Sequence, residues 1–144
     1  MLVSQILKMK PISDIATITP EATLAEAARQ LSTRRIGCLV VSSDGSQVDG
    51  MLSERDIVRE IGKHGPNVLG QPVSVVMTHT VVTCKGEDQA ADVATRMTEG
   101  RFRHMPVMDE GRMTGLISIG DVVKARLSEL AMEKKALEGM IMGY

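Results

Sequence analysis

A seven-residue pattern occurs twice in this chain and limits what the chain can fold into. Residues 50–56 read Gly-Met-Leu-Ser-Glu-Arg-Asp, and 65 positions later residues 115–121 read Gly-Leu-Ile-Ser-Ile-Gly-Asp. Both copies have a glycine, two apolar residues, a serine, two variable residues and an aspartate. An internal repeat of this kind indicates two copies of one structural unit, and therefore two versions of one polar site.

The repeat extends over most of the chain. Apolar spacing and turn residues predict the same order in each half: an extended segment, a helix, two strands joined by a glycine-containing turn, and a last helix. In the first half these elements are expected at 16–19, 24–31, 37–41, 48–52 and 54–61. In the second half they are expected at 81–84, 90–97, 104–108, 113–117 and 119–130.

Each half is therefore a β-α-β-β-α unit, and the chain is predicted to be an α+β protein. A unit of about 50 residues buries too little apolar surface to be stable alone, so two units are expected to pack together. We place the first unit at residues 10–65, the second at 73–130 and a C-terminal helical extension at 131–144. Short helices over 1–10 and 73–77 are expected to lead into the first and the second unit, respectively.

The composition excludes several functional classes. The net charge is −1 and the only aromatic residues are Phe102 and Tyr144, so no basic face or stacking platform indicates nucleic-acid binding. Cys38 and Cys84 lack the spacing of a zinc site or a disulfide framework, which favours a reducing compartment. No apolar run is long enough to span a membrane and no signal peptide is recognisable, so we expect a cytoplasmic protein.

Motifs of catalysis are also missing from the sequence. No nucleophile elbow, P-loop or zinc-protease motif is present, and the three histidines are scattered without metal-ligand spacing. We therefore expect neither enzymatic activity nor a bound metal.

The repeated Ser-x-x-Asp has two interpretations. The first is a capping box, in which the serine accepts from the first helical turn and the aspartate complements the helix dipole. The second is a ligand site, because free N–H groups at a helix N-terminus bind anions and an aspartate can accept from the two hydroxyls of a ribose. Phosphate and ribose held in this way would form a nucleotide half-site, present twice.

The duplicated motif, in this order of elements, resembles a pair of cystathionine-β-synthase (CBS) domains, a Bateman module. The resemblance covers residues 10–130. It implies two units related by a pseudo-twofold axis, with clefts that bind adenosine-containing ligands such as AMP, ATP, NAD(H) or S-adenosylmethionine. It also implies a regulatory role and a homodimer, and the regulated protein stays unidentified.

The resemblance also implies the residues that bind the ligand. Ser53 with Asp56 and Ser118 with Asp121 match the phosphate- and ribose-contacting positions. The adenine pocket is expected at the first strand and the start of the second strand of each unit. In the first unit this set is Thr17, Thr19, Ile36, Gly37 and Cys38. In the second unit it is Thr80, Val82, Thr83, Phe102, Arg103, His104, Met105 and Pro106.

The two motifs differ in their neighbouring charges. Arg55 lies inside the first motif, whereas Arg101, Arg103 and His104 precede the strand of the second unit. We therefore expect two unlike sites, with Arg55 in the first and the larger positive charge, suited to a pyrophosphate or a dinucleotide, in the second. In the alternative interpretation these arginines, and Arg34 and Arg35 in the related places of the first unit, are solvated surface residues, and His104 is a satisfied strand residue.

An apolar stripe follows the C-terminal helix. Its members are Val123, Leu127, Leu130, Leu137 and Ile141, and only Lys134 interrupts it. The stripe predicts a dimer seam or a contact with a partner, and the alternative is packing against the chain's own lead-in helix. The module could therefore also be a structural interaction protein whose clefts hold no nucleotide.

Overall fold

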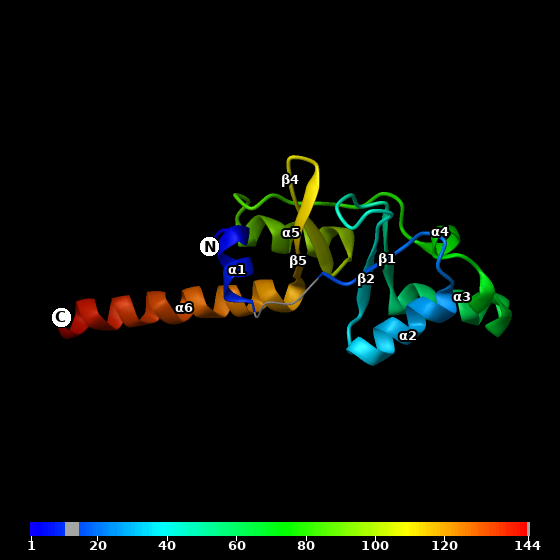
Figure 1. The fold of residues 1–144 in the computed structure, drawn as a ribbon. Helices are drawn as coiled ribbons and strands as arrows, with labels where there is room; N and C mark the ends of the chain where they lie inside the picture. The colour runs from blue at the N-terminus through cyan, green and yellow to red at the C-terminus, as the bar shows by residue number, and fades with distance from the viewer. Residues whose placement is uncertain (11–14, 144) are drawn as a thin grey trace.

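Two α+β units lie side by side in the computed structural model, which describes residues 1–10 and 15–143, and a long C-terminal helix projects from one of them (Figure 1). The first unit contains β1 (Thr17–Ile18), α2 (Leu24–Arg34), β2 (Cys38–Val41), β3 (Gly50–Ser53) and α3 (Glu54–His64). The second contains α5 (Ala90–Gly100), β4 (His104–Asp109), β5 (Arg112–Ser118) and α6 (Ile119–Met142). The predicted fold class is confirmed, and the order of elements agrees except for the first strand of the second unit.

The sheets are small and share one topology. In the first unit β1 pairs parallel with β2, and β2 pairs antiparallel with β3. In the second unit β4 pairs antiparallel with β5. The extended segment expected at 81–84 contributes one parallel bridge, in which Cys84 N donates to Pro106 O at 3.0 Å and Met108 N donates to Cys84 O at 2.8 Å.

Helices α2 and α5 occupy equivalent places because their sequences bury the same face. Leu24, Ala27 and Leu31 are buried in the first core, and the equivalent apolar residues of α5 are buried in the second. Both helices end on an arginine in the left-handed conformation, Arg35 at φ 53° and Arg101 at φ 57°. These caps turn the chain sharply toward β2 and β4.

The lead-in helices α1 (Val3–Met9) and α4 (Val73–Val76) are exchanged relative to our prediction. Val3 and Ile6 of α1 are buried in the core of the second unit, not the first. Val3 N donates to the carbonyl of Asp88 at 2.9 Å, which fixes α1 beside the start of α5. The predicted assignment of residues 1–10 to the first unit is therefore wrong.

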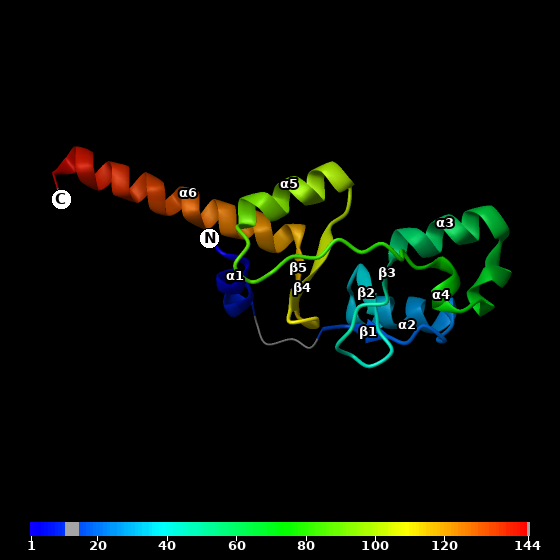
Figure 2. The same ribbon diagram turned by 90° about the horizontal axis from the view of Figure 1, so that it is seen from above.

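Helix α4 crosses in the opposite direction: it precedes the second unit in the sequence but packs on the first. Val73 and Val76 are buried in the core of the first unit. Val73 N donates to Ala22 O at 2.7 Å and Leu24 N donates to Gln71 O at 3.0 Å, so the segment is tied to the start of α2. Figure 2 shows α4 beside α2 and α3, with the segment that follows it passing across to the second unit. The core of each unit therefore includes a short helix that precedes the other unit in the sequence.

The crossings explain the glycine of each repeated motif. A Cβ atom on Gly50 would lie 2.6 Å from Met77 Sδ and 2.8 Å from Thr78 O. A Cβ atom on Gly115 would lie 2.8 Å from Leu7 Cδ1. In each unit the glycine marks the place where the crossing segment packs directly on the strand.

Two predicted boundaries also change. Helix α3 continues through Gly62 to His64, beyond its predicted end at residue 61. A 3₁₀ turn, η1 (Pro66–Gly70), follows it and buries Val68 in the first core. Helix α6 continues without a break to Met142. Tyr144, the end of the predicted extension, lies outside the described residues. Across 1–10 and 15–143, no helix combines the length and hydropathy needed to cross a membrane.

Candidate functional site

Both serines of the repeated motif cap a helix, so the capping-box interpretation is confirmed. Ser53 Oγ accepts from Asp56 N at 3.3 Å, and Asp56 Oδ2 accepts from Ser53 N at 2.8 Å. The second copy repeats this geometry, with Asp121 N donating to Ser118 Oγ at 3.1 Å and Ser118 N donating to Asp121 Oδ2 at 2.9 Å. The caps place each serine and aspartate where a strand ends and a helix begins, next to the neighbouring unit.

The residues opposite the two serines lie at the centre of the molecule. Cys38 pairs with Ser53 across β2 and β3, and His104 pairs with Ser118 across β4 and β5. Cys38 and His104 each line two separate clefts, one on either side. They therefore form a wall that the two clefts share.

The first of these spaces, which we call the arginine cleft, has a volume of about 510 Å³. Eleven of the predicted binding residues line it: Gly37, Cys38, Ser53, Arg55, Asp56, Thr80, Val82, Arg101, Phe102, Arg103 and His104. Val81, between the predicted Thr80 and Val82 in the strand where the adenine pocket was expected, also lines it. Met51, Arg59, Thr78 and Gly100 complete the lining and were not predicted.

The arginine cleft combines the motif of the first unit with the strand entry of the second. Our prediction placed Arg55 in one cleft and Arg101 and Arg103 in the other, and it is wrong because all three line the same space, between the first motif and the start of β4. Asp56 Oδ1 is held by Arg59 NH1 at 3.0 Å. The lining is rich in guanidinium groups, which favours an anionic ligand.

The second space, the lysine cleft, has a volume of about 580 Å³. Of the predicted residues, Ile36, Cys38, His104 and Ser118 line it, and Arg34 lies there too. The lining residues that the sequence did not reveal are Leu7, Lys8, Lys10, Ile15, Ala16, Thr114, Gly115 and Leu116. Leu7 and Lys8 belong to α1 and Lys10 follows directly after it, so the crossing again explains why they were missed.

Lys10 occupies the place where a ribose was expected. Its Nζ atom lies 2.9 Å from Asp121 Oδ2 and donates to Leu116 O at 2.9 Å. Asp121 is thereby tied to the end of α1 and lies just behind Ser118 of the lysine cleft.

Six predicted residues lie outside the described lining of both clefts: Thr17, Thr19, Thr83, Met105, Pro106 and Asp121. Met105 and Pro106 are buried in the second unit. The carbonyl of Thr83 accepts from Arg96 NH1 at 2.8 Å. Thr17 is half-buried within β1, and Thr19 follows the end of that strand.

Burial and neighbouring charges set the protonation of the central residues. Burial, helped by the charge of Asp56, raises the pKa of the Cys38 thiol to about 12, so Cys38 is a neutral thiol. Burial also raises the pKa of Asp121, but the backbone N–H of Ser118 and the ammonium of Lys10 outweigh it and hold that pKa below its ordinary value. Asp121 is therefore a carboxylate at neutral pH.

His104 is neutral for a related reason. Burial lowers the pKa of His104, and the positive charge of Arg103 lowers it further. Asp121 acts in the opposite direction, while Lys10 lowers the pKa and Glu54 raises it, with smaller effects. A neutral imidazole can donate or accept one hydrogen bond toward either cleft.

Within residues 1–10 and 15–143, histidine, cysteine, aspartate and glutamate form no group of three that could hold a metal ion.

A sequence profile of the CBS domain matches residues 3–63 and 73–128. The chain belongs to the CBS domain family. The two matches correspond to the two halves of the repeat, so the resemblance seen in the sequence is confirmed.

Related CBS-domain proteins cover nearly the whole of this CBS pair. The crystal structure of a CBS-domain containing protein, ATU1752 from Agrobacterium tumefaciens, is 42% identical, with a TM-score of 0.83, and covers 88% of this chain and 99% of that one. A CBS domain protein from Pyrobaculum aerophilum, PAE2072, complexed with AMP, is 25% identical, with a TM-score of 0.77, over 92% of this chain and 99% of that one.

Among curated proteins, the mitochondrial CBSX3 of Arabidopsis thaliana is 33% identical over 129 residues, which is 87% of this chain and 63% of that protein. Including CBSX3, this chain spans between 22% and 63% of the length of four plant relatives that it matches.

Proposed function

We propose that this CBS pair is a regulatory module, not an enzyme, that binds an adenosine-containing ligand in one or both clefts. The candidates are AMP, ATP, NAD(H) and S-adenosylmethionine. The observation that carries the proposal is the arginine cleft, a space of about 510 Å³ that Ser53 and Asp56 of the first capping box line together with four arginines. That volume lies within the roughly 300–1,000 Å³ of small-molecule sites. The AMP complex of the P. aerophilum relative supports an adenosine ligand.

The lining of the arginine cleft offers a group for each part of a nucleotide. Val82 and Phe102 offer apolar surface for a purine ring, and Asp56 offers carboxylate oxygens for ribose hydroxyls. Arg55 and Arg101 offer charge-assisted donors for phosphate oxygens. With two further arginines nearby, we propose that this cleft prefers a ligand with more than one phosphate.

The lysine cleft suggests how binding is transmitted. A ligand ribose that reaches Asp121 competes with Lys10, whose Nζ atom lies 2.9 Å from the carboxylate. Lys10 follows directly after α1, and α1 packs in the core of the second unit. Ligand binding would therefore favour the arrangement of α1 in which Lys10 has left Asp121, which is a population shift.

Calorimetry with AMP, ATP, NAD+, NADH and S-adenosylmethionine tests the proposal. Asp56→Asn should weaken binding in the arginine cleft and Asp121→Asn in the lysine cleft, because each removes a carboxylate while retaining an oxygen for the cap. Asp92→Asn, also in the first turn of a helix but outside the cleft linings, is the matched control. A ligand at a hundred times its Kd should stabilise the fold by about 2.7 kcal/mol. If none of the five ligands binds or raises the Tm, the proposal fails.

A protein-interaction role is the second candidate, and the exposed apolar side chains of α6 favour it. In that case the regulated protein would bind equally well with and without nucleotide. Capture of a defined partner whose affinity does not change when a cleft-binding ligand is added would favour this role over sensing.

A further inference from the structure

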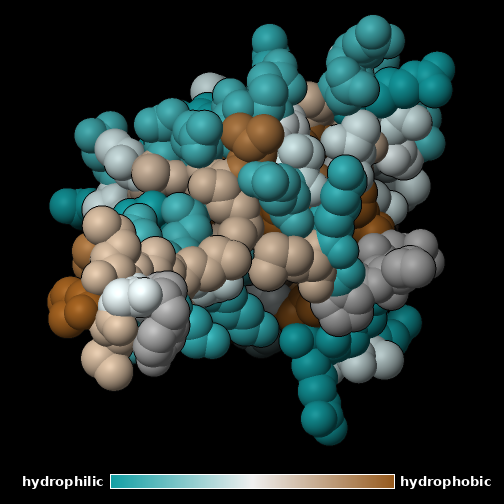
Figure 3. Space-filling view, turned by 90° about the vertical axis from the view of Figure 1, so that its left-hand side faces the viewer, coloured by the Kyte–Doolittle hydropathy of each residue, from teal (hydrophilic) through white to brown (hydrophobic). Residues whose placement is uncertain are grey.

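Helix α6 carries an apolar face that nothing in the described chain covers. The exposed fractions are 49% for Val123, 61% for Leu127, 52% for Leu130, 59% for Leu137 and 83% for Ile141. Figure 3, in which the C-terminal end of α6 faces the viewer, shows apolar side chains gathered on the projecting end of the helix. Helix α1 packs against the opposite side of α6, where the N-terminal ammonium group lies 3.1 Å from Glu129 Oε1. The chain's own lead-in helix therefore does not cover the stripe.

The spacing of these residues fits pairing with another helix. From Val123 to Ile141 the positions follow steps of four, three, four, three and four, with Lys134 as the one charged member. Alternating steps of four and three residues keep one face turned toward a partner helix. The stripe spans roughly 27 Å at about 1.5 Å per residue. Residues 131–142 are exposed except at Gly139, and a helix without tertiary contacts is marginal in water.

The charges decide the direction of the partner. In a parallel pair of α6 helices, Lys134 would face Lys134 of the second copy, and Glu133 would lie beside Glu138. In an antiparallel pair, Lys134 instead packs across from Leu130, and Lys124 lies beside Glu138 twice. The two Glu133 side chains then approach each other near the centre, but both Lys134 ammonium groups lie next to them. Electrostatic complementarity of this kind fixes orientation and register.

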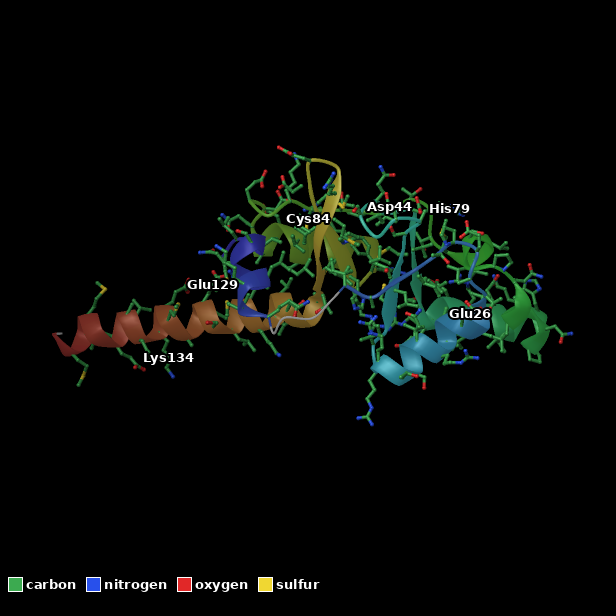
Figure 4. All side chains as sticks on the ribbon, in the orientation of Figure 1. Glu26, Asp44, His79, Cys84, Glu129 and Lys134 are labelled. Carbon is green, nitrogen blue, oxygen red and sulfur yellow. The ribbon has the colours of Figure 1, made fainter. Side chains whose placement is uncertain are left out.

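The antiparallel register also matches the apolar residues along the helix. Leu127 faces Leu137 of the second copy, and Val123 faces Ile141, so the part of α6 beside the units is covered by the projecting part of the other copy. Figure 4 shows Lys134 on that projecting part, clear of the two units.

We propose that α6 pairs antiparallel with α6 of a second copy of this chain, with residues 131–142 of each copy covering Val123 and Leu127 of the other. Nucleotide is not required for this pairing, so the proposal goes beyond the ligand-binding function and does not depend on it.

Analytical ultracentrifugation of the full chain tests the pairing. We expect a dimer at micromolar concentration, and Leu137→Glu should raise its dissociation constant by roughly a hundredfold or more, because two charges enter an apolar seam. Met132→Glu is the matched control, since Met132 is exposed on the same helix but outside the stripe. Val58→Glu tests an alternative dimer through the exposed face of α3. A monomer in the unsubstituted protein, or a dimer that Val58→Glu breaks and Leu137→Glu does not, would overturn the proposal.

Cysteine cross-linking tests the orientation. The native Cys38 and Cys84 are buried, so introduced thiols on α6 would react first. Leu127→Cys and Leu137→Cys proteins should each cross-link poorly to themselves, but an equal mixture should give the mixed dimer. Efficient self-cross-linking of each single variant would indicate a parallel pair and contradict the antiparallel register.

Discussion

Gly50→Ala is expected to destabilise the protein, although Gly→Ala in a strand usually has a favourable effect through the unfolded state. The new Cβ atom would lie 2.8 Å from Thr78 O and 2.6 Å from Met77 Sδ. The thioether can move, because methionine has several rotatable bonds. The carbonyl cannot retreat alone, because it accepts from Met51 N at 3.0 Å while Thr78 N donates to Met51 O at 2.8 Å.

The magnitude follows from these contacts. Overpacking costs about 1–3 kcal/mol, and the lost freedom of the unfolded chain returns about 0.4–1 kcal/mol. The net loss in the free energy of unfolding for Gly50→Ala is therefore about 1–2 kcal/mol. For a chain of this length the corresponding decrease in Tm is roughly 3–8 °C. Because Thr78 lines the arginine cleft, the same substitution should also weaken ligand binding there.

Gly115→Ala provides the matched control. Its Cβ atom would meet only the end of the Leu7 side chain, at 2.8 Å from Cδ1, which can rotate away. We expect a smaller loss than for Gly50→Ala, and Leu7→Ala should relieve the clash in the double variant. Urea unfolding followed by circular dichroism gives the free energy of unfolding of Gly50→Ala, of Gly115→Ala and of the double variant. The reasoning is refuted if Gly50→Ala is as stable as the unsubstituted protein, or if Met77→Ala fully restores its stability, because the carbonyl contact would then not matter.

Two further predictions concern the crossing of α1 and the cap of α6. Ile6→Ala should cost about 2–5 kcal/mol, and hydrogen exchange should show β4 and β5 losing protection before β2 and β3, whereas loss in the first unit would contradict the crossing. The pKa of Asp121 is lowered in the folded state, so its contribution to stability is present at neutral pH and is lost as the pH falls below about 4. Urea unfolding at several pH values should therefore show the difference between the protein and Asp121→Asn shrinking in acid, and a constant difference would be evidence against this linkage.

The order of elements could be predicted because it depends on local patterns. The apolar spacing of Leu24, Ala27 and Leu31 fixes a helix face without reference to the rest of the chain. The capping boxes at Ser53 and Ser118 are equally local, since donor and acceptor are three residues apart. The continuation of α6 to Met142 agrees with the helical extension predicted over 131–144, although a helix that projects from the units has no buried face to set its end.

The crossing of the lead-in helices could not be predicted from those patterns. Helices α1 and α4 each bury two apolar residues, Val3 and Ile6 or Val73 and Val76, and the two units offer equivalent surfaces to them. Nothing within either helix selects one unit over the other. One signal was present in the sequence, because a glycine repeated in a strand indicates close approach of another segment, but it does not say which segment approaches.

The crossing also explains why the candidate site was only partly predicted. Each unit contributes its own Ser-x-x-Asp, and these residues could be found from the motif alone. The other basic residues that line each cleft are distant from its motif in the sequence. Arg101 and Arg103 of the second unit line the cleft of the first motif, and Lys8 and Lys10, near the N-terminus, line the cleft of the second. Sequence distance was therefore a poor guide to which charges share a cleft.

The two clefts share a wall. Cys38 and His104 line both clefts, and each is paired in register with a capping serine, Ser53 or Ser118. A ligand that shifts the start of β2 or β4 in one cleft must therefore change the wall of the other. Energetic coupling between two sites is reciprocal, so whatever one ligand does to the affinity of the second, the second does equally to the first. The two clefts differ in the charged residues that line them, but they share the wall formed by Cys38 and His104.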